Sequence, residues 1–558
     1  MASSPDLPKP ASGFLHWAPR IASAILIPIL LLALAEGALR LFGYGYSTSL
    51  MEPCTIHGHP SSCYNLFFPA PYFPPGMIKT PQLYSIDPIK PPNTYRIFIL
   101  GESAAMGDPD PAYGFSRYLE VMLRHRFPNT KFEVVNTGMV AINSHVSAAI
   151  ARELANYKPD LFLVYEGSNE VVGPFGPGTV LTTSSMSLPI VRASVFMRST
   201  RLGQLLTQTG KPRSEWRGME MFLNKQVRAD SPRLEPAYRN FSSNMKSIVS
   251  IGQTSGARVL FSTIATNLRD SAPFASLHKH GLSSDTLNAW AQLVQQGAQF
   301  ENSSNYPEAL TSYIQAAKLD DHYAELHFRI ARCQSALGDF PAAKEHYLRA
   351  RDLDVLRFRA DSRINDIIRS VAKTSGPGVQ LLDADSIFAN ESHNGVIGSE
   401  LLYDHVHFTP QGSYLLASAA YEQIVGSLTP SIAKPASLAA PPSEAECARL
   451  LAFTSHDRSR VAGEMVERMQ RPPFTTQLNH SEQIQRLMFR AVGSTETLED
   501  TAAQYQWAIS QSPDDLTLHY KFGLFLFGYD RQASAQQLIL ARPNDAFPVF
   551  LPDGTQIQ

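Results

Sequence analysis

The chain has 558 residues, enough for three or four domain-sized units. Apolar residues make up 44% of it and charged residues 18%, a composition that excludes wholesale disorder. The 48 basic and 50 acidic residues leave a formal net charge of −2, so the charge balance indicates no nucleic-acid partner, and four cysteines exclude a disulfide scaffold.

An apolar run near the N-terminus predicts an export or anchoring signal. Residues 21–35 carry no charge, Glu36 interrupts the run, and apolar residues continue to Phe42. The uncharged run is shorter than the roughly 20 residues that a full span needs. The extended run therefore spans a membrane only if Glu36 and Arg40 lie near an interface.

A cleaved signal peptide is the alternative, because Ala33 and Ala35 form an A-x-A pattern. A buried core helix fits the terminal position less well. We favour an uncleaved single-pass anchor, with Lys9 and Arg20 on the inner side. Both the anchor and the signal peptide place the main body outside the cytoplasm, in a periplasmic or extracellular position.

Cys54 and Cys63 support export. They flank a short loop rich in Pro, Gly, Ser and His, which closes easily as a disulfide in an oxidising compartment. A metal site that adds His57 and His59 to the two thiols is the alternative, although this spacing matches no usual zinc pattern.

Short apolar runs alternate with helical patterns from residue 95 onward. Helices are expected at about 114–126, 144–157 and 235–253. Strands are expected at 95–100, 131–138, 160–167, 257–266 and 379–385. This alternation predicts an α/β fold with a mostly parallel sheet covered on both faces.

A repeat interrupts this pattern between the fourth and fifth strands. Five positions match at an offset of 34 residues, the period of tetratricopeptide repeats. They are Tyr306 and Phe340, Pro307 and Pro341, Ala309 and Ala343, Tyr313 and Tyr347, and Ala316 and Ala350. A less regular copy follows in the C-terminal region, with Tyr505, Ala508, Pro513 and Gly523 at matching positions. Helical repeats are therefore expected at about 287–357 and 495–540.

These patterns divide the chain into seven segments. They are a tail and anchor or signal peptide (1–44), a Pro- and aromatic-rich irregular lead-in (45–93), a first α/β part (94–284), helical repeats (285–358), a second α/β part (359–430), a linker (431–448) and a C-terminal helical region (449–558).

Polar residues follow the predicted strand ends. Ser103 stands just past the first strand, Gly138 ends the second, and Asn169 follows the third. Ligands bind at the carboxyl ends of strands in open α/β sheets. Downstream, Asp404 and His407 lie three residues apart ahead of a helix, so the carboxylate can orient the imidazole while the imidazole takes a proton from the serine.

This set of motifs resembles the SGNH/GDSL hydrolase superfamily over about 95–270 and 360–428. The blocks occur in order as GES, NTG, GSNE and DHVHFTPQG. The resemblance implies a flavodoxin-like, three-layered fold with Ser103 as nucleophile, His407 as base and Asp404 as its partner. It also implies an oxyanion hole made by the N–H groups of Ser103 and Gly138 and the side chain of Asn169, with no metal and no cofactor.

Two positions depart from the usual family pattern. Glu102 replaces the aspartate before the nucleophile, and Glu170 ends the third block where aspartate is commoner. Both acids are expected near the cleft, where they affect substrate choice more than mechanism. His405 is expected to be a surface or supporting residue, and His145 either lines the cleft or begins a helix.

Together these features predict a membrane-anchored, outward-facing serine esterase. Its expected substrates are esters, including O-acetyl groups on an envelope or secreted carbohydrate. An O-acyltransferase that uses the same triad is one alternative. The other is an interaction scaffold whose repeats bind a partner protein and whose hydrolase site is vestigial.

Overall fold

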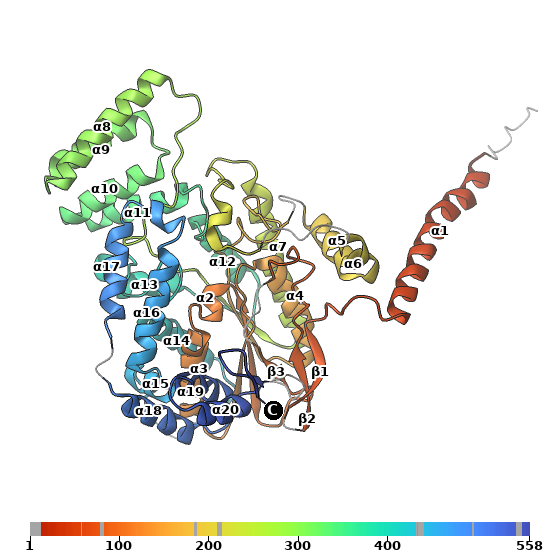
Figure 1. Ribbon diagram of the computed structural model, residues 1–558. Coiled ribbons are helices and arrows are strands. Elements are labelled where there is room, and N and C mark those ends of the chain that lie inside the picture. Colours follow the sequence, from red (N-terminus) through yellow and green to blue (C-terminus); the bar gives the residue numbers. More distant parts are fainter. Residues whose placement is uncertain are drawn as a thin grey trace, which may run out of the picture.

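The structure is a computed structural model that describes residues 13–56, 58–78, 83–182, 187–208, 215–430, 432, 440–493, 496–542 and 549–557. Figure 1 shows an α/β body from which the N-terminal helix projects on one side and a helical pair on the other.

The core is a five-stranded sheet in which every neighbouring pair is parallel. Its strands are β4 (Thr94–Gly101), β5 (Lys131–Asn136), β6 (Leu161–Tyr165), β7 (Arg258–Ser262) and β8 (Val379–Leu382). They lie in the order β5-β4-β6-β7-β8. The predicted α/β class is confirmed. The expected ranges for β5 to β8 extended too far at their carboxyl ends because the residues there leave the sheet to form loops.

Helices cover both faces of this sheet (Figure 1). Helix α3 packs on α14, while α7 packs on both α4 and α12. The covering helices are α3 (Phe115–Arg126), α4 (Ser144–Leu154), α7 (Leu234–Ser255), α12 (Ser362–Thr374), α13 (Ala384–Glu391) and α14 (Pro410–Val425). All residues of β4 and β6 are buried, as expected for central strands covered on both faces.

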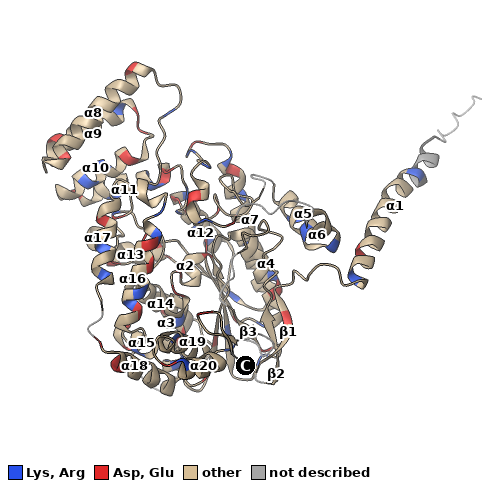
Figure 2. Cartoon of the chain, viewed as in Figure 1, with Lys and Arg blue, Asp and Glu red and all other residues tan. Residues whose placement is uncertain are grey.

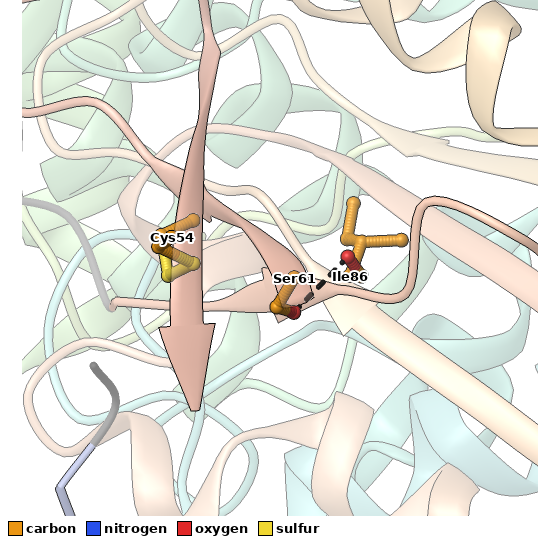
Figure 3. The surroundings of a disulfide bond; sticks show 4 residues. Cys54, Ser61 and Ile86 are labelled. Atoms are coloured by element: carbon orange, nitrogen blue, oxygen red, sulfur yellow. Dashed lines mark hydrogen bonds between the residues drawn. A yellow bond between two sulfur atoms is a disulfide. The ribbon is translucent and has the colours of Figure 1, made fainter. Parts of the chain in front are cut away.

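The expected irregular lead-in contains an antiparallel sheet of β1 (Met51–Ile56), β2 (His59–Tyr64) and β3 (Ser85–Ile86). A disulfide joins Cys54 to Cys63 across β1 and β2, and Ser61 Oγ donates to the carbonyl of Ile86 at 3.3 Å (Figure 3). The prolines in both longer strands hid this sheet from sequence analysis, since proline is unusual inside a strand. His57, of the alternative metal site, lies outside the described residues.

Four helices stand between β7 and α12, and each packs on the next. They are α8 (Ser284–Asn302), α9 (Tyr306–Leu319), α10 (Ala324–Ala336) and α11 (Phe340–Leu353). Helices α9 and α11 begin 34 residues apart. Three of the five matched positions are buried in both copies, namely Ala309 and Ala343, Tyr313 and Tyr347, and Ala316 and Ala350. A Cβ at Gly297 would lie 2.5 Å from the Tyr313 ring, so the first pair of helices is closely packed.

The C-terminal helices pack on the α/β body. They are α15 (Glu444–Leu450), α16 (Ser455–Met469), α17 (His480–Ala491), α18 (Leu498–Gln511), α19 (Leu516–Leu526) and α20 (Arg531–Leu540), followed by the short strands β9 (Val549–Phe550) and β10 (Gln556–Ile557). The rings of Tyr113 and Phe453 stack at 4.0 Å, and Arg117 pairs with Asp515. Much of the expected linker lies outside the described residues, and α15 begins within its range.

Helix α1 (Gly13–Leu41) projects from the body (Figure 1). Within its segment Arg20–Leu41, an 18-residue window has a mean hydropathy of 2.2 and no buried residue. By length and composition this segment can cross a membrane, and a signal sequence would meet the same criteria. The base of α1 packs on α6 (Arg201–Gln208), which follows α5 (Leu188–Ser199).

Candidate active site

Ser103 is placed by a turn that requires glycine. It is the first residue of α2 (Ser103–Met106), which begins two residues after the end of β4. Gly101 has φ +155°, and a Cβ there would lie 2.0 Å from the carbonyl oxygen of Tyr165. Only glycine lets β4 end this close to β6 and still turn into α2.

His407 and Asp404 meet Ser103 although 304 residues separate the histidine from the serine. His407 Nε2 lies 2.9 Å from Ser103 Oγ, and His407 Nδ1 lies 2.7 Å from Asp404 Oδ2. The other carboxylate oxygen of Asp404 accepts the N–H groups of Val406 and His407, each at 2.9 Å. The arrangement matches a serine, a base and the carboxylate that orients the base.

The electrostatics of this group favour a charged Asp404. Burial alone would raise the pKa of its carboxyl, but the His407 and His405 rings hold that pKa well below its ordinary value. Burial would lower the pKa of His407, but Asp404 and Asp108 raise it. A carboxylate that stays ionised beside the imidazole stabilises the imidazolium formed when the serine loses its proton.

The three predicted oxyanion donors are not equally placed. Ser103 and Asn169 line the same cavity. The N–H of Gly138 instead donates to Asn136 Oδ1 at 3.0 Å, and Asn136 Nδ2 is held by the carbonyl of Ala105 at 2.8 Å. The structure therefore brings two of the three donors to the cavity and engages the third with a neighbouring side chain.

Asp108 is a second carboxylate at the histidine, and sequence analysis missed it. Its Oδ2 lies 3.1 Å from His407 Nε2, the nitrogen that also faces Ser103. Arg468 of α16 pairs with Asp108, with Nη2 3.1 Å from Oδ1. The only signal in the sequence that could have identified Asp108 was its position in the same GESAAMGD segment as the nucleophile.

A cavity of about 600 Å³ opens at Ser103, Asn169 and His407. Aromatic rings line one part of it, from Trp216, Phe222, Phe358 and Phe474. Charged side chains of α16 and of the turn after it line another, from Glu464, Glu467, Arg468 and Arg471. The C-terminal helical region thus supplies part of the wall of the site.

Three buried carboxyl groups lie beside the nucleophile turn. Oxygen atoms of Glu102, Glu166 and Glu170 lie within 4.8 Å of one another. Glu102 accepts the N–H groups of Ser168 at 2.9 Å and Asn169 at 2.8 Å, so it positions the loop that carries the Asn169 amide. Both departures from the family pattern, Glu102 and Glu170, therefore belong to one cluster, and Glu166 is a member that sequence analysis missed.

Burial, and for Glu102 and Glu166 also repulsion within the cluster, raises the pKa of these groups. The pKa of Glu102 rises to about 8, that of Glu170 to about 7, and that of Glu166 well above its ordinary value. The three carboxyls therefore share protons at neutral pH and do not all ionise.

Replacing Glu166 with glutamine is expected to preserve the fold and activity, because glutamine has the shape of a protonated glutamic acid. A raised pKa also means that the native state binds more protons than the unfolded state, so stability is lost as pH rises from the ordinary glutamate value of 4.5 to about 8. Thermal unfolding of the wild type should show this loss, and E166Q should show less of it. A wild-type midpoint that falls on addition of EDTA, with no such fall in E166Q, would instead indicate a cation bound by this cluster.

The two other histidines noted in the sequence have partners other than Ser103. His405 is buried, with Nδ1 3.3 Å from Asp404 Oδ1 and its ring edge-on to Phe274. It is a supporting residue and not a surface one. His145 Nδ1 lies 3.1 Å from Asn244 Nδ2, and burial lowers the pKa of His145 to about 4.

No protein-family model matches the chain, and no curated protein matches it in sequence. Among solved structures, a GDSL-like lipase from Bacteroides thetaiotaomicron is similar, with 10% identity, a TM-score of 0.26, and coverage of 60% of this chain and 89% of the lipase. An acetyl xylan esterase has 9% identity and a TM-score of 0.28 over 59% of this chain and 99% of its own. A lipase/acylhydrolase from Enterococcus faecalis has 13% identity and a TM-score of 0.26 over 60% and 98%. The fold assignment above rests on the strand order of this chain itself.

Proposed function

We propose that the protein is a serine esterase of the SGNH type. The observation that carries this proposal is the continuous contact from Ser103 Oγ through His407 to Asp404, at 2.9 Å and 2.7 Å. Serine at a strand end with an oriented histidine is the arrangement that acyl transfer requires.

The reaction follows from this geometry. Ser103 Oγ attacks the ester carbonyl while His407 Nε2 takes its proton, and the Ser103 N–H and Asn169 amide stabilise the oxyanion. Collapse expels the alcohol, which takes its proton from His407, and leaves an acyl-serine. Water, deprotonated by His407, then releases the acid and restores the serine.

The substrate class that we propose is an O-acylated carbohydrate of an envelope or secreted polymer. The cavity is much larger than an acetyl group, and its rings can stack on sugars while the polar groups of α16 bind hydroxyls. The same acyl-serine would serve an O-acyltransferase if a sugar hydroxyl outcompetes water in this cavity.

We further propose that α1 anchors the protein in a membrane with the α/β body on the outer side. The disulfide between Cys54 and Cys63 supports an oxidising compartment. We also propose the domain boundaries given above. In addition, we propose that α8 to α11 form a tetratricopeptide-type surface that binds a partner protein.

A fluorophosphonate probe is expected to label the wild type at Ser103 and to leave S103A unlabelled. The reagent reacts with a serine hydroxyl only when a neighbouring base activates it. Peptide mapping of the adduct measures this directly. An unlabelled but folded wild type, together with a partner that binds S103A equally well, would favour the scaffold alternative.

A further inference from the structure

The helices α5 and α6 present an apolar surface next to the proposed anchor. The exposed positions of α5 include Ile190, Phe196 and Met197, whose side chains are 54%, 67% and 53% exposed. On α6, Leu205 and Leu206 are 38% and 64% exposed. A helix on the surface of a soluble protein normally turns its polar face outward, so these exposed apolar side chains depart from the usual pattern.

The outward side of α5 is almost uniformly apolar. Its exposed residues are Pro189, Ile190, Arg192, Ala193, Phe196 and Met197, which fall on one side of the helix at 100° per residue, while Val191 is buried. Arg192 is the only charged member of this set. Helix α5 is therefore apolar on its outward side as well as on the side that faces the protein.

Hydrogen bonds join the start of α6 to Glu36 of α1. The carboxylate of Glu36 accepts the N–H groups of Arg201 at 3.1 Å and Leu202 at 2.9 Å, at the start of α6. Arg40 Nε also donates to Glu36, at 2.7 Å. A second pair of bonds joins Gln204 to the backbone of Tyr46 just after α1.

These contacts account for an acidic residue inside the apolar run. Glu36 stands five residues before the end of the candidate span, which is about 8 Å along a helix. A span of 22 residues is about 33 Å long, so in a hydrocarbon core about 30 Å thick Glu36 would lie roughly 6 Å inside the outer boundary, a depth that the apolar face of an interfacial helix reaches. Since α6 begins at Glu36, α6 would lie at that same level.

The charge of the two helices suits a lipid surface. Residues 188–208 contain three arginines and no acidic residue, and Figure 2 shows basic but no acidic positions on this pair. Arginines beside exposed apolar side chains are typical of helices that lie in the headgroup region of a membrane.

We propose that α5 and α6 form a second membrane contact, lying in the headgroup region of the outer leaflet beside α1. This inference rests on the proposed membrane anchor. It implies that the α/β body is held against the bilayer at two places and does not rotate freely on a single tether.

The test places a fluorophore on the proposed contact in the full-length chain. Phe196→Cys and Leu206→Cys are each labelled with NBD and reconstituted into vesicles of phosphatidylcholine and phosphatidylglycerol. Phe489→Cys is the matched control, because Phe489 is also an exposed aromatic residue, at 83%, but lies on α17. The native cysteines leave little background, since Cys333 and Cys447 are buried and the other two are bonded.

Lipids with a nitroxide near the headgroup are expected to reduce NBD emission at positions 196 and 206 at least twofold and to leave position 489 unchanged. Vesicle-bound protein with equal, weak quenching at all three positions would overturn the second contact while keeping the anchor. A blue-shifted probe at 196 that lipid nitroxides do not quench would assign the surface to a protein and also overturn it. Full-length protein that does not float with vesicles would overturn both the anchor and this inference, without bearing on the esterase.

Discussion

Replacing Ser103 or His407 with alanine is expected to lower kcat/KM for p-nitrophenyl acetate by about 10³-fold or more. The serine supplies the nucleophile, and the histidine 2.9 Å away supplies the base that activates it. Because the two act as one unit, the double variant should be no worse than either single variant. Steady-state kinetics of the four proteins measures this cycle.

Asn136 offers a control of a different kind. Its Oδ1 accepts the N–H of Gly138 at 3.0 Å, so it holds the backbone at the second strand end without touching the serine–histidine pair.

Full activity in S103A would exclude the proposed nucleophile. A hydrolase that ignores the small ester while still reacting with the fluorophosphonate would point to an acyltransferase with a strict donor.

The parallel sheet was predictable because its signals are local. The run from Tyr95 to Leu100 is apolar throughout, as a strand covered on both faces must be, and glycine follows it. The serine and the distant histidine were also predictable, since carboxyl ends of parallel strands meet at one edge and each block follows such an end. The helices inserted between β7 and α12 do not disturb this, because β7 and β8 still pair as parallel neighbours in the sheet.

Other parts of the site had no local signal. Arg468 lies 360 residues from Asp108 and belongs to a helix whose sequence indicates only an amphipathic pattern. The engagement of Gly138 by Asn136 depends on side-chain packing that no spacing encodes. Glu166 ends a run of apolar residues and becomes a member of the carboxyl cluster only when the loops after β4 and β6 come together.

The position of Arg468 links the C-terminal helices to the chemistry. Neutral His407 must offer its Nε2 lone pair to the serine hydroxyl, whereas the carboxylate of Asp108, 3.1 Å from the same nitrogen, favours the protonated ring. Arg468 opposes this effect because its positive charge pairs with Asp108 and lowers the pKa of His407. The other titratable groups near the ring are Asp404 and His405, which lies beside Asp404, together with Glu464, which pairs with Arg468.

Substitutions at these two residues should therefore shift the acid limb of the pH–rate profile in opposite directions. Activity needs neutral His407, so kcat/KM rises with pH through the pKa of that histidine. D108N removes a charge that raises this pKa and should move the limb to lower pH. R468Q leaves Asp108 unopposed and should move the limb to higher pH. The expected cost is about tenfold in kcat/KM on the acid side, while kcat/KM on the plateau changes less.

R471Q is the matched control, because Arg471 lines the same cavity but pairs with Glu467 and not with Asp108. Profiles of kcat/KM for the three variants measure the shifts, and parallel loss at every pH would mean that Arg468 only supports the fold.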